Sequence, residues 1–429
     1  MERLLGAEEL PRFLDSLAEP PVRGLRLNPH KVSASELALL LGVELTPAPW
    51  ADNGFVLAPD APSLGAHPAI DCGLFYLQDP ASMLAPAVLD PAPGSRVADI
   101  AAAPGGKATD LAARVGPRGV LLANEVVRPR LKLLEGALER WGSANTITAS
   151  LAVDKLPGTW DGVLLDAPCT GEALYRRDQN SARGWSDASV RGNAKRQARL
   201  LDAAASLVRP GGGALVYSTC SFELAEDEEQ VASFLDRHAD FELGEAATLP
   251  SVTRGIGLER TARIWPHRAP GNGQFVARLV RGGDPAPEPS RHHDKPHRSA
   301  LAAWHEFREH AMPGFGTDDD AILARADTLY LVPDHIPGQL SRPGLPLGRI
   351  RPGRFEPAPA LATALDPAKA AETTPHTPEY LRGETTESAG PDGWVLITYE
   401  RWGLGWARRT GGTLKNFFPK ASRRLRVGR

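Results

Sequence analysis

Strand-like and helix-like segments alternate along the middle of the chain, from about residue 76 to 280, and this alternation constrains the fold more than any other feature. SRVADIAAA, GVLLANE, NTITAS, WDGVLLDAPC and GALVYSTCS have the pattern of strands, and RIWPH and GQFVARLV look like two further ones. KATDLAARV, RPRLKLLEGALERWG and NAKRQARLLDAAASLV carry apolar residues at helical spacing between them. The pattern predicts an α/β fold with a doubly wound, mostly parallel, Rossmann-like sheet.

Composition divides the 429 residues into four segments. We expect a small N-terminal α/β domain (residues 1–75), the alternating core (76–283), a linker (284–300) and a C-terminal region (301–429). The linker is rich in Pro, Gly and His and has few apolar residues, which is typical of a connecting segment. A chain of this length suits two or three domains.

Bulk charge and cysteine content exclude several classes of protein. The formal net charge is only -3, so any nucleic-acid interface must be a local feature. Cys72, Cys169 and Cys220 form neither a disulfide framework nor a metal-ligand spacing, which favours a reducing cytoplasm and no bound metal. The sequence has no apolar run of membrane-spanning length, and its start carries acidic residues where a signal peptide would be apolar. We expect a cytoplasmic protein without a membrane partner.

The loops that follow the predicted strands hold the residues of chemical interest. Open α/β sheets bind ligands beyond the carboxyl ends of their strands. AAAPGGK follows the first strand, Glu125 ends the second, DAPCTG follows the fourth and STCSF the fifth. We therefore expect these segments to surround one pocket.

The first of these loops predicts a nucleoside site rather than a triphosphate site. It comprises Ala101, Ala102, Ala103, Pro104, Gly105, Gly106 and Lys107. A phosphate-binding P-loop needs Gly at position 101 and Ser or Thr at 108, and both are Ala here. The small residues let the backbone approach a ligand, and Glu125 can hold ribose hydroxyls. The expected cofactor is S-adenosylmethionine, and a plain tight turn is the alternative.

Cys169 and Cys220 indicate chemistry at a pyrimidine carbon. A thiolate that adds to carbon 6 of cytosine makes carbon 5 nucleophilic enough to attack a sulfonium methyl group. Asp166 is placed to steady the charge at ring nitrogen 3, and Lys107 is a candidate to lower one thiol's pKa. An enzyme that methylates an exocyclic amine would be expected to have an aromatic residue where Cys169 stands. Alone, each cysteine reads equally well as a small buried residue, and that is our interpretation of Cys72. The chemistry does not decide which of the other two attacks.

DIAAAPGGK, DAPCTG and STCSF together resemble the Sun-type family of RNA 5-methylcytosine methyltransferases. The resemblance extends over about residues 20–280 and includes LRLNPHK, YLQDPASM, RIWPH and Gln197. It implies that Cys220 is the nucleophile and that Cys169 assists product release. It also implies cofactor contacts from Ala101 to Lys107, at Glu125 and at Asp166.

The chain departs from this family at the segment after the third strand. Many members have an Asp there near the adenine, whereas this chain has TITASLAVDKL. The adenine contact in this chain is therefore Ser150, Asp154 or neither of them. Ala101 also stands where many members have Cys.

The end of the chain predicts an RNA-binding region. Residues 401–429 contain nine Arg or Lys and no acidic residue, and aromatic residues lie in or near this stretch: Trp394, Trp402, Trp406, Phe417 and Phe418. Such residues can bind phosphates and stack on bases, or the aromatics can form a small core. GWARRTGGTLKNFFPKASRRLR resembles the end of the bacterial small-subunit ribosomal RNA methylases of the F type, which implies a PUA-like domain.

Two further basic segments, LRLNPHK and ALYRRD, predict RNA contacts as well. Arg26 and Lys31 are expected to contact RNA, and Arg176 with Arg177 to grip the target backbone or to pair with Asp178. The sequence therefore predicts a monomeric enzyme that methylates cytosine carbon 5 in small-subunit ribosomal RNA or the 30S subunit, and not DNA. Transfer RNA or another ribosomal RNA is an alternative substrate. A ribosome-assembly protein that has lost catalysis is the alternative of another class.

Overall fold

The computed structural model describes residues 1–178, 184–246, 248–285, 298–333, 340–352 and 354–424. The chain forms two compact units. Unit 1 comprises Met1–Pro62, Tyr76–Leu134 and Ala149–Pro289, and unit 2 comprises Ser63–Phe75, Glu135–Thr148 and Ser290–Arg429. Within the described ranges, no helix is long and apolar enough to cross a membrane.

The central sheet has the strand order β11-β12-β13-β9-β8-β5-β6-β7, with β10 paired to β13. Its strands are β5 (Arg96–Asp99), β6 (Val120–Asn124), β7 (Thr146–Ala149), β8 (Gly162–Asp166), β9 (Ala214–Thr219), β10 (Phe241–Leu243), β11 (Thr253–Arg254), β12 (Ala262–Ile264) and β13 (Gln274–Arg281). β5 pairs in parallel with β6 and β8, and β8 with β9, whereas β13 is antiparallel to β9. The predicted doubly wound, mostly parallel sheet is confirmed.

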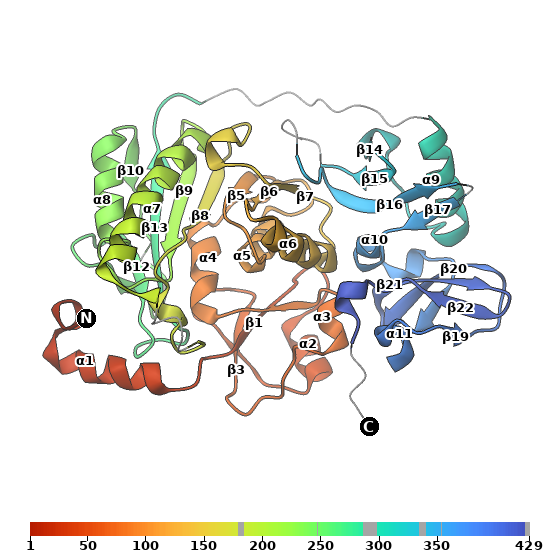
Figure 1. Cartoon of the computed structure of the whole chain (residues 1–429), viewed down its shortest axis with the longest axis horizontal. Coiled ribbons are helices and arrows are strands. Elements are labelled where there is room, and N and C mark those ends of the chain that lie inside the picture. Colours follow the sequence, from red (N-terminus) through yellow and green to blue (C-terminus); the bar gives the residue numbers. More distant parts are fainter. Residues whose placement is uncertain (179–183, 247, 286–297, 334–339, 353, 425–429) are drawn as a thin grey trace. The chain divides into compact units, whose positions relative to one another are not determined.

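The helices of this sheet lie on both of its faces. They are α4 (Leu84–Leu89), α5 (Gly106–Val115), α6 (Arg128–Trp141), α7 (Asp187–Leu207) and α8 (Glu228–Arg237). α7 and α8 pack on one face, and α4 and α5 pack on the other (Figure 1). Right-handed crossovers require this, because the chain moves one way from β5 to β6 and the opposite way from β8 to β9. The reversal between β5 and β8 opens a crevice at their carboxyl ends.

The N-terminal residues form a second, smaller sheet of order β2-β3-β1-β4. It contains β1 (Gly24–Leu27), β2 (Leu45–Pro47), β3 (Gly54–Leu57) and β4 (Phe75–Leu77), with helices α1 (Glu2–Ala18), α2 (Ala34–Leu41) and α3 (Pro68–Asp71). Every residue of β1 is buried. The strand predicted over RIWPH ends at Ile264, because Trp265 instead stacks on Phe222, with the ring centroids 5.3 Å apart, and packs edge-on against Phe13.

Unit 2 contains two further sheets. The first is β14 (Ile322–Arg325), β15 (Thr328–Leu331), β16 (Leu345–Arg351) and β17 (Arg354–Pro357), and the second has the order β18-β20-β21-β22-β19. The latter comprises β18 (Thr373–Pro375), β19 (Thr386–Glu387), β20 (Gly393–Tyr399), β21 (Trp402–Thr410) and β22 (Thr413–Asn416). The helices are α9 (Arg298–Ala311), α10 (Pro359–Ala364) and α11 (Pro378–Arg382). Residues 286–297 of the expected linker lie outside the described residues.

Candidate active site

Cys169 and Cys220 lie at the carboxyl ends of two paired strands. β8 and β9 are in register, with Asp166 opposite Ser218, so the loops that follow them leave the sheet side by side. The two sulfur atoms are 3.4 Å apart, and neither thiol is in a disulfide. Both residues are partly exposed, so a substrate can reach them. The structure thus brings together the two cysteines that the sequence placed at one pocket.

Asp166 joins the thiols to the first loop. Its Oδ2 accepts a hydrogen bond from Lys107 Nζ at 2.7 Å, and its Oδ1 accepts one from Ser218 Oγ at 2.7 Å. Burial by itself lowers the pKa of Lys107, but the charge and hydrogen bond of Asp166 outweigh it, and the thiol of Cys220 adds to the rise. Lys107 is therefore a cation that faces both Asp166 and Cys220.

The two thiols have different electrostatic surroundings. The hydrogen bond with Cys220 and, after it, burial raise the pKa of Cys169 well above its usual range, and the charge of Glu226 contributes. Cys220 instead interacts with the cationic Lys107. A cation favours a thiolate and a nearby carboxylate disfavours one. The surroundings therefore favour Cys169 as the protonated thiol.

A network of side chains holds the loop around Cys169. Gln197, on the buried face of α7, donates from Nε2 to the Pro168 carbonyl at 2.9 Å and to Glu226 Oε2 at 2.7 Å. Glu226 also accepts from the backbone N–H of Thr170 at 3.1 Å and from the hydroxyl of Thr170. The residues on both sides of Cys169 are thus fixed to one carboxylate and one amide.

Glu226 was missed as a site residue in the sequence. It stands in the acidic run EDEEQV, where α8 begins at Glu228, and Glu226 precedes that helix without any exposure to solvent. Asp227 and Glu228 also have a specific partner, because Arg263 Nη2 lies 2.8 Å from Asp227 Oδ2 and contacts Glu228. A pattern of charges along a sequence does not reveal such burial.

The loop from Ala101 to Lys107 connects β5 to α5. Gly105 has a φ of +116°, which is a conformation that favours glycine, and Thr109 Oγ1 donates to the Gly105 carbonyl at 2.8 Å. Ala102 N donates to the Asn124 carbonyl at 2.9 Å. The Asn124 side chain also donates to the Ile100 and Leu151 carbonyls, so it fixes the loops after β5 and β7 together. Sequence reasoning missed Asn124.

Arg26 supports this loop from the N-terminal sheet. Its Nη2 donates to the Gly106 carbonyl at 2.9 Å and to Thr109 Oγ1 at 2.5 Å, and its Nε donates to Gln78 Oε1 at 3.2 Å. The residue is 1% exposed. The prediction that Arg26 contacts RNA is therefore wrong, because its guanidinium is enclosed against the first turn of α5.

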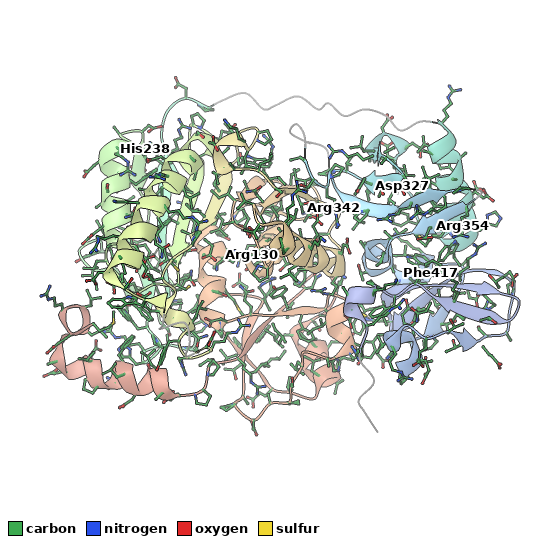
Figure 2. The ribbon with its side chains drawn as sticks, viewed as in Figure 1. Arg130, His238, Asp327, Arg342, Arg354 and Phe417 are labelled. Carbon is green, nitrogen blue, oxygen red and sulfur yellow. The ribbon has the colours of Figure 1, made fainter. Side chains whose placement is uncertain are left out.

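Glu125 and Arg130 form the far side of the same pocket. The Glu125 carboxylate is buried, accepts from Val127 N at 2.8 Å, and lies 3.5 Å from Arg130 Nη1. Arg130, labelled in Figure 2, also donates to the Ala103 carbonyl at 2.8 Å. Arg130 therefore links the end of β6 to the loop after β5.

Asp99 is a buried carboxylate at the end of β5. Neither carboxylate oxygen has a hydrogen-bond partner at proper geometry within the described part of the chain. Burial, followed by the charge of Asp166, raises the pKa of Asp99 to about 7, and Lys107 and the Ala101 N–H offset only part of the rise. A ligand with an ammonium group fits such a carboxylate, and Glu125 suits vicinal hydroxyls. The residues present therefore fit S-adenosylmethionine.

Ser150 and Asp154, the two candidates for the adenine contact, have different surroundings. Ser150 is partly exposed beside the Leu151 that Asn124 holds, whereas Asp154 is exposed and its carboxylate lies 3.3 Å from Lys155 Nζ. The backbone next to Ser150 is thus hydrogen-bonded to Asn124 at the end of β6, and the Asp154 carboxylate is paired with Lys155.

Arg176 is a structural residue. Its guanidinium donates to the Pro20 carbonyl at 2.7 Å and to the Gly271 carbonyl at 3.3 Å, and its side chain is 2% exposed. The prediction that it grips the RNA backbone is wrong, because it ties the segment after α1 to the core. Arg177 is exposed.

The C-terminal aromatic residues serve mainly as core. Trp406 and Phe418 are buried, and Trp406 joins Trp304 and Phe355 in the hydrophobic centre of unit 2. Trp394 and Phe417, the latter labelled in Figure 2, pack on each other with ring centroids 4.8 Å apart. The prediction of base-stacking aromatics is therefore wrong for Trp406 and Phe418, and their predicted alternative role as a small core holds.

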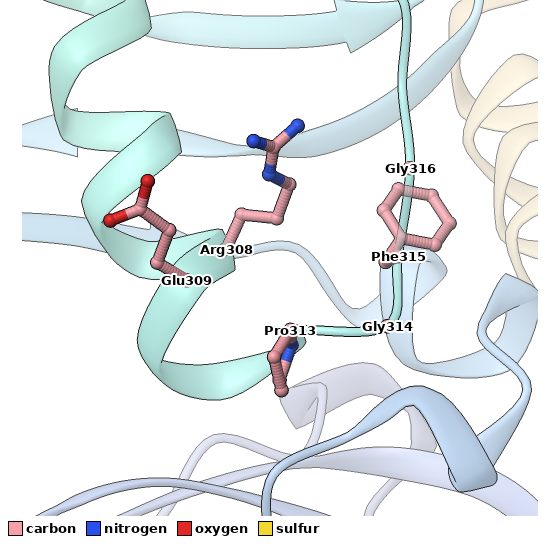
Figure 3. A pocket seen from close by; sticks show the side chains of 6 residues that line it. All are labelled: Arg308, Glu309, Pro313, Gly314, Phe315 and Gly316. Atoms are coloured by element: carbon pink, nitrogen blue, oxygen red, sulfur yellow. The ribbon is translucent and has the colours of Figure 1, made fainter.

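Unit 2 also has a hollow of about 400 Å³ at the end of α9. Figure 3 shows Arg308 extending toward the loop that carries Phe315, while Glu309 points away from that loop. The hollow is lined by none of the predicted site residues.

Four family descriptions match successive parts of the chain. They are 16S rRNA methyltransferase RsmB/F (residues 86–280), the N-terminal domain of 16S rRNA methyltransferase RsmF (1–80), the RsmF rRNA methyltransferase first C-terminal domain (306–365) and the methyltransferase RsmF PUA domain (373–424). The last match confirms the predicted PUA-like C-terminal region.

Curated relatives and solved structures give the same result. The chain is 34% identical to ribosomal RNA small subunit methyltransferase F of Erwinia tasmaniensis, over 98% of this chain and 94% of that protein. It is also 34% identical to the protein of that name from Klebsiella pneumoniae, over 95% and 91%.

Among solved structures, a methyltransferase homolog protein from Pyrococcus horikoshii matches with a TM-score of 0.58 and 32% identity, over 65% of this chain and 92% of that chain. NSun6 from the same organism, with SFG, matches with a TM-score of 0.59 at 23% identity, over 66% of this chain and 97% of that chain, which supports the fold alone. The predicted family resemblance is confirmed: the chain belongs to the RsmF family of 16S rRNA methyltransferases.

Proposed function

We propose that this chain transfers a methyl group from S-adenosylmethionine to carbon 5 of cytosine in 16S ribosomal RNA, through a covalent bond between Cys220 and carbon 6. The observation that carries the proposal is the 3.4 Å separation of the two sulfur atoms beside the Lys107–Asp166 pair. Two thiols and an acid–base pair at one strand edge suit addition to a pyrimidine ring. The family named above is one of RNA methyltransferases, which supports the substrate class.

Cys220 begins the reaction. Its sulfur, beside the Lys107 cation, donates an electron pair to carbon 6 of the base, and the ring electrons move toward nitrogen 3. The Lys107–Asp166 pair is the nearest source of a proton or a hydrogen bond for that nitrogen. S-adenosylmethionine, when bound, supplies a methyl group made electrophilic by its sulfonium sulfur, and carbon 5 takes it.

Cys169 acts at the end of the reaction. Carbon 5 then loses its proton to water that reaches the partly exposed site, the carbon–sulfur bond at carbon 6 breaks, and the electron pair of that bond returns to Cys220. Cys169 lies 3.4 Å from that sulfur, and its raised pKa favours the protonated thiol, so it is placed to assist expulsion of Cys220. The order of the two cysteines follows from the family resemblance, and their different surroundings support it.

The cofactor side of the pocket holds the donor. Asp99 and Glu125 suit the ammonium group and the ribose hydroxyls, while the Ala101–Lys107 backbone passes close to the ligand. Arg26 and Arg130 keep that backbone in position from two sides. Asp99, Glu125, Arg26 and Arg130 therefore bind and orient the cofactor or the loop around it.

The deciding experiment measures tritiated methyl transfer by the purified chain onto 16S ribosomal RNA from a strain that lacks the enzyme. We expect incorporation that a nuclease digest assigns to 5-methylcytosine. Incorporation into transfer RNA or another ribosomal RNA alone would support the alternative substrates. Tight RNA binding with no incorporation into any RNA would favour the assembly-protein alternative and overturn the proposal. Free RNA and 30S subunits are tested separately, because the substrate state is part of the proposal.

A further inference from the structure

Trp185 has an unusual environment for a tryptophan of this chain. All nine tryptophans are among the described residues, and Trp185 is the one whose side chain is exposed, at 44%. The others are buried or half-buried in the cores described above. Because tryptophan is highly buried on average, this exposed ring is a candidate contact residue.

The ring is anchored at the mouth of the active site. Trp185 Nε1 donates a hydrogen bond to Glu172 Oε1 at 3.1 Å, and the other oxygen of Glu172 accepts from Thr170 Oγ1 at 2.8 Å. Thr170 directly follows Cys169. Two hydrogen bonds therefore connect the exposed ring to the loop that carries one of the two thiols.

A second exposed apolar side chain lies near the nucleophile. Leu174 is 43% exposed and ends the short helix that begins at Glu172. A Cβ atom at Gly171 would lie 3.4 Å from Leu174 Cδ1 and 3.9 Å from Cys220 Sγ, so Leu174 and the sulfur lie against the same glycine. The N–H of Ala173 also donates to the Cys220 carbonyl at 3.1 Å.

The carboxyl groups near Trp185 favour a nucleobase over a phosphate as its ligand. Glu172 accepts the indole N–H, and Glu223 lies close enough to Glu172 that burial and then the charge of Glu172 raise the pKa of Glu223. Two carboxyl groups repel a phosphate backbone at this point. The face of a nucleobase is uncharged, and its exocyclic amines can donate to carboxylates.

We propose that the indole face of Trp185 stacks on an unpaired base of the RNA next to the target cytosine, with Leu174 covering the gap to the thiols. This inference rests on the proposed function, because it says how the RNA substrate is bound while the target cytosine is unstacked. Stacking outside the pocket would stabilise a target base that has left its neighbours. Trp185 is a substrate-binding residue here and takes no part in bond making.

The test compares Trp185→Phe, Trp185→Leu and Trp185→Ala with the unaltered chain and with Leu39→Ala, which removes an 85% exposed side chain on α2. The probes are 16S ribosomal RNA lacking the modification and a short single-stranded oligocytidylate. One stacked base accounts for about 5- to 150-fold in affinity. We expect the Leu and Ala variants to lose affinity within that range and to raise KM for RNA by a similar factor.

The Phe variant keeps an aromatic face and should lose only a few-fold, while Leu39→Ala should bind RNA as the unaltered chain does. The Kd for S-adenosylmethionine and the melting temperature should not change in the Phe and Leu variants. Ultraviolet cross-linking to the oligocytidylate should label the tryptic peptide GWSDASVR, which contains Trp185.

Equal RNA affinity of the Leu variant and the unaltered chain would overturn the proposal, as would a parallel loss of cofactor binding in the Phe and Leu variants. Normal methyl transfer together with an unaffected Leu variant would leave the proposed function standing and remove only the stacking role. A cross-link at Trp185 with no methyl transfer by the unaltered chain would remove the function and leave the stacking role.

Discussion

The two sides of the pocket are built in opposite ways. On the cofactor side, the buried Asp99 carboxylate has no hydrogen-bond partner among the described residues, so this half is completed only when a ligand brings a cation. On the base side, Glu226 and Gln197 bond to each other and to the loop around Cys169, so this half is complete without a ligand. The cofactor side binds and releases a cofactor in every catalytic cycle. The base side must keep two sulfur atoms at a fixed distance from each other.

The largest effect is expected from Cys220→Ala. Methyl transfer should fall by at least ~10³-fold, because Cys220 forms the bond to carbon 6 in the proposed mechanism. A denaturing gel should show no RNA–protein adduct, and binding of S-adenosylmethionine should be unchanged because the cofactor side is intact. A variant that still captures RNA covalently would show that the order of the cysteines is reversed.

Cys169→Ala should slow turnover by ~10²-fold or more and accumulate a covalent adduct, since release and not attack is impaired. The adduct should carry the labelled methyl group. An inactive variant without any adduct would instead place Cys169 in the attack step and would remove the division of roles proposed for the base side.

Glu226→Ala tests whether the base side depends on its side-chain network. The N–H of Thr170 and the Gln197 amide would lose their acceptor, the loop would shift, and turnover should fall by about 10- to 100-fold with some adduct accumulating. Glu229→Ala, in the next turn and exposed, is the matched control.

The Cys169→Ala/Glu226→Ala double variant should turn over no more slowly than Cys169→Ala alone, since Glu226 acts through Cys169. Fully additive losses would show that Glu226 has a separate, general effect on stability.

On the cofactor side, Arg26→Ala should raise the Kd for S-adenosylmethionine by about 10-fold, because the first turn of α5 loses the donor to the Gly106 carbonyl. Isothermal titration measures this directly. Arg23→Ala is the control, because Arg23 lies in the same small sheet but bonds to the Ala58 and Ala61 carbonyls. Equal losses in both variants would assign the effect to the N-terminal fold as a whole.

The smallest change is expected in the stability of the cofactor-free chain. The folded pKa of Asp99, about 7, lies above its ordinary value of 3.8, so its favourable contribution is present below about pH 4 and is lost as the pH rises through about 7. Asp99→Asn should therefore melt a few degrees higher than the unaltered chain at about pH 8 and lose that advantage at about pH 4. A difference that does not vary with pH would show that Asp99 is matched by a group of the protein.

The central sheet was predictable because β5, β6, β8 and β9 are near-continuous apolar runs and the connecting segments have helical spacing. The cysteine pair followed from the parallel order, since neighbouring parallel strands end at one edge. Arg26 and Arg176 were misassigned because a sequence displays charge but not enclosure, and both guanidinium groups bond to backbone carbonyls. The partners of Glu226 are far apart along the chain, so no local pattern indicates them.

The hydrogen bond from Arg26 to the Gly106 carbonyl limits how the chain can be cut into functional fragments. A fragment that starts at the alternating core would lack the guanidinium that holds the cofactor loop, so the residues that define the catalytic motif do not form a transplantable module. Chimaeras between relatives should therefore take Arg26 and the loop that contains Gly106 from the same parent. Boundaries drawn from motifs alone would cut through the side-chain contacts that make the pocket able to hold its cofactor.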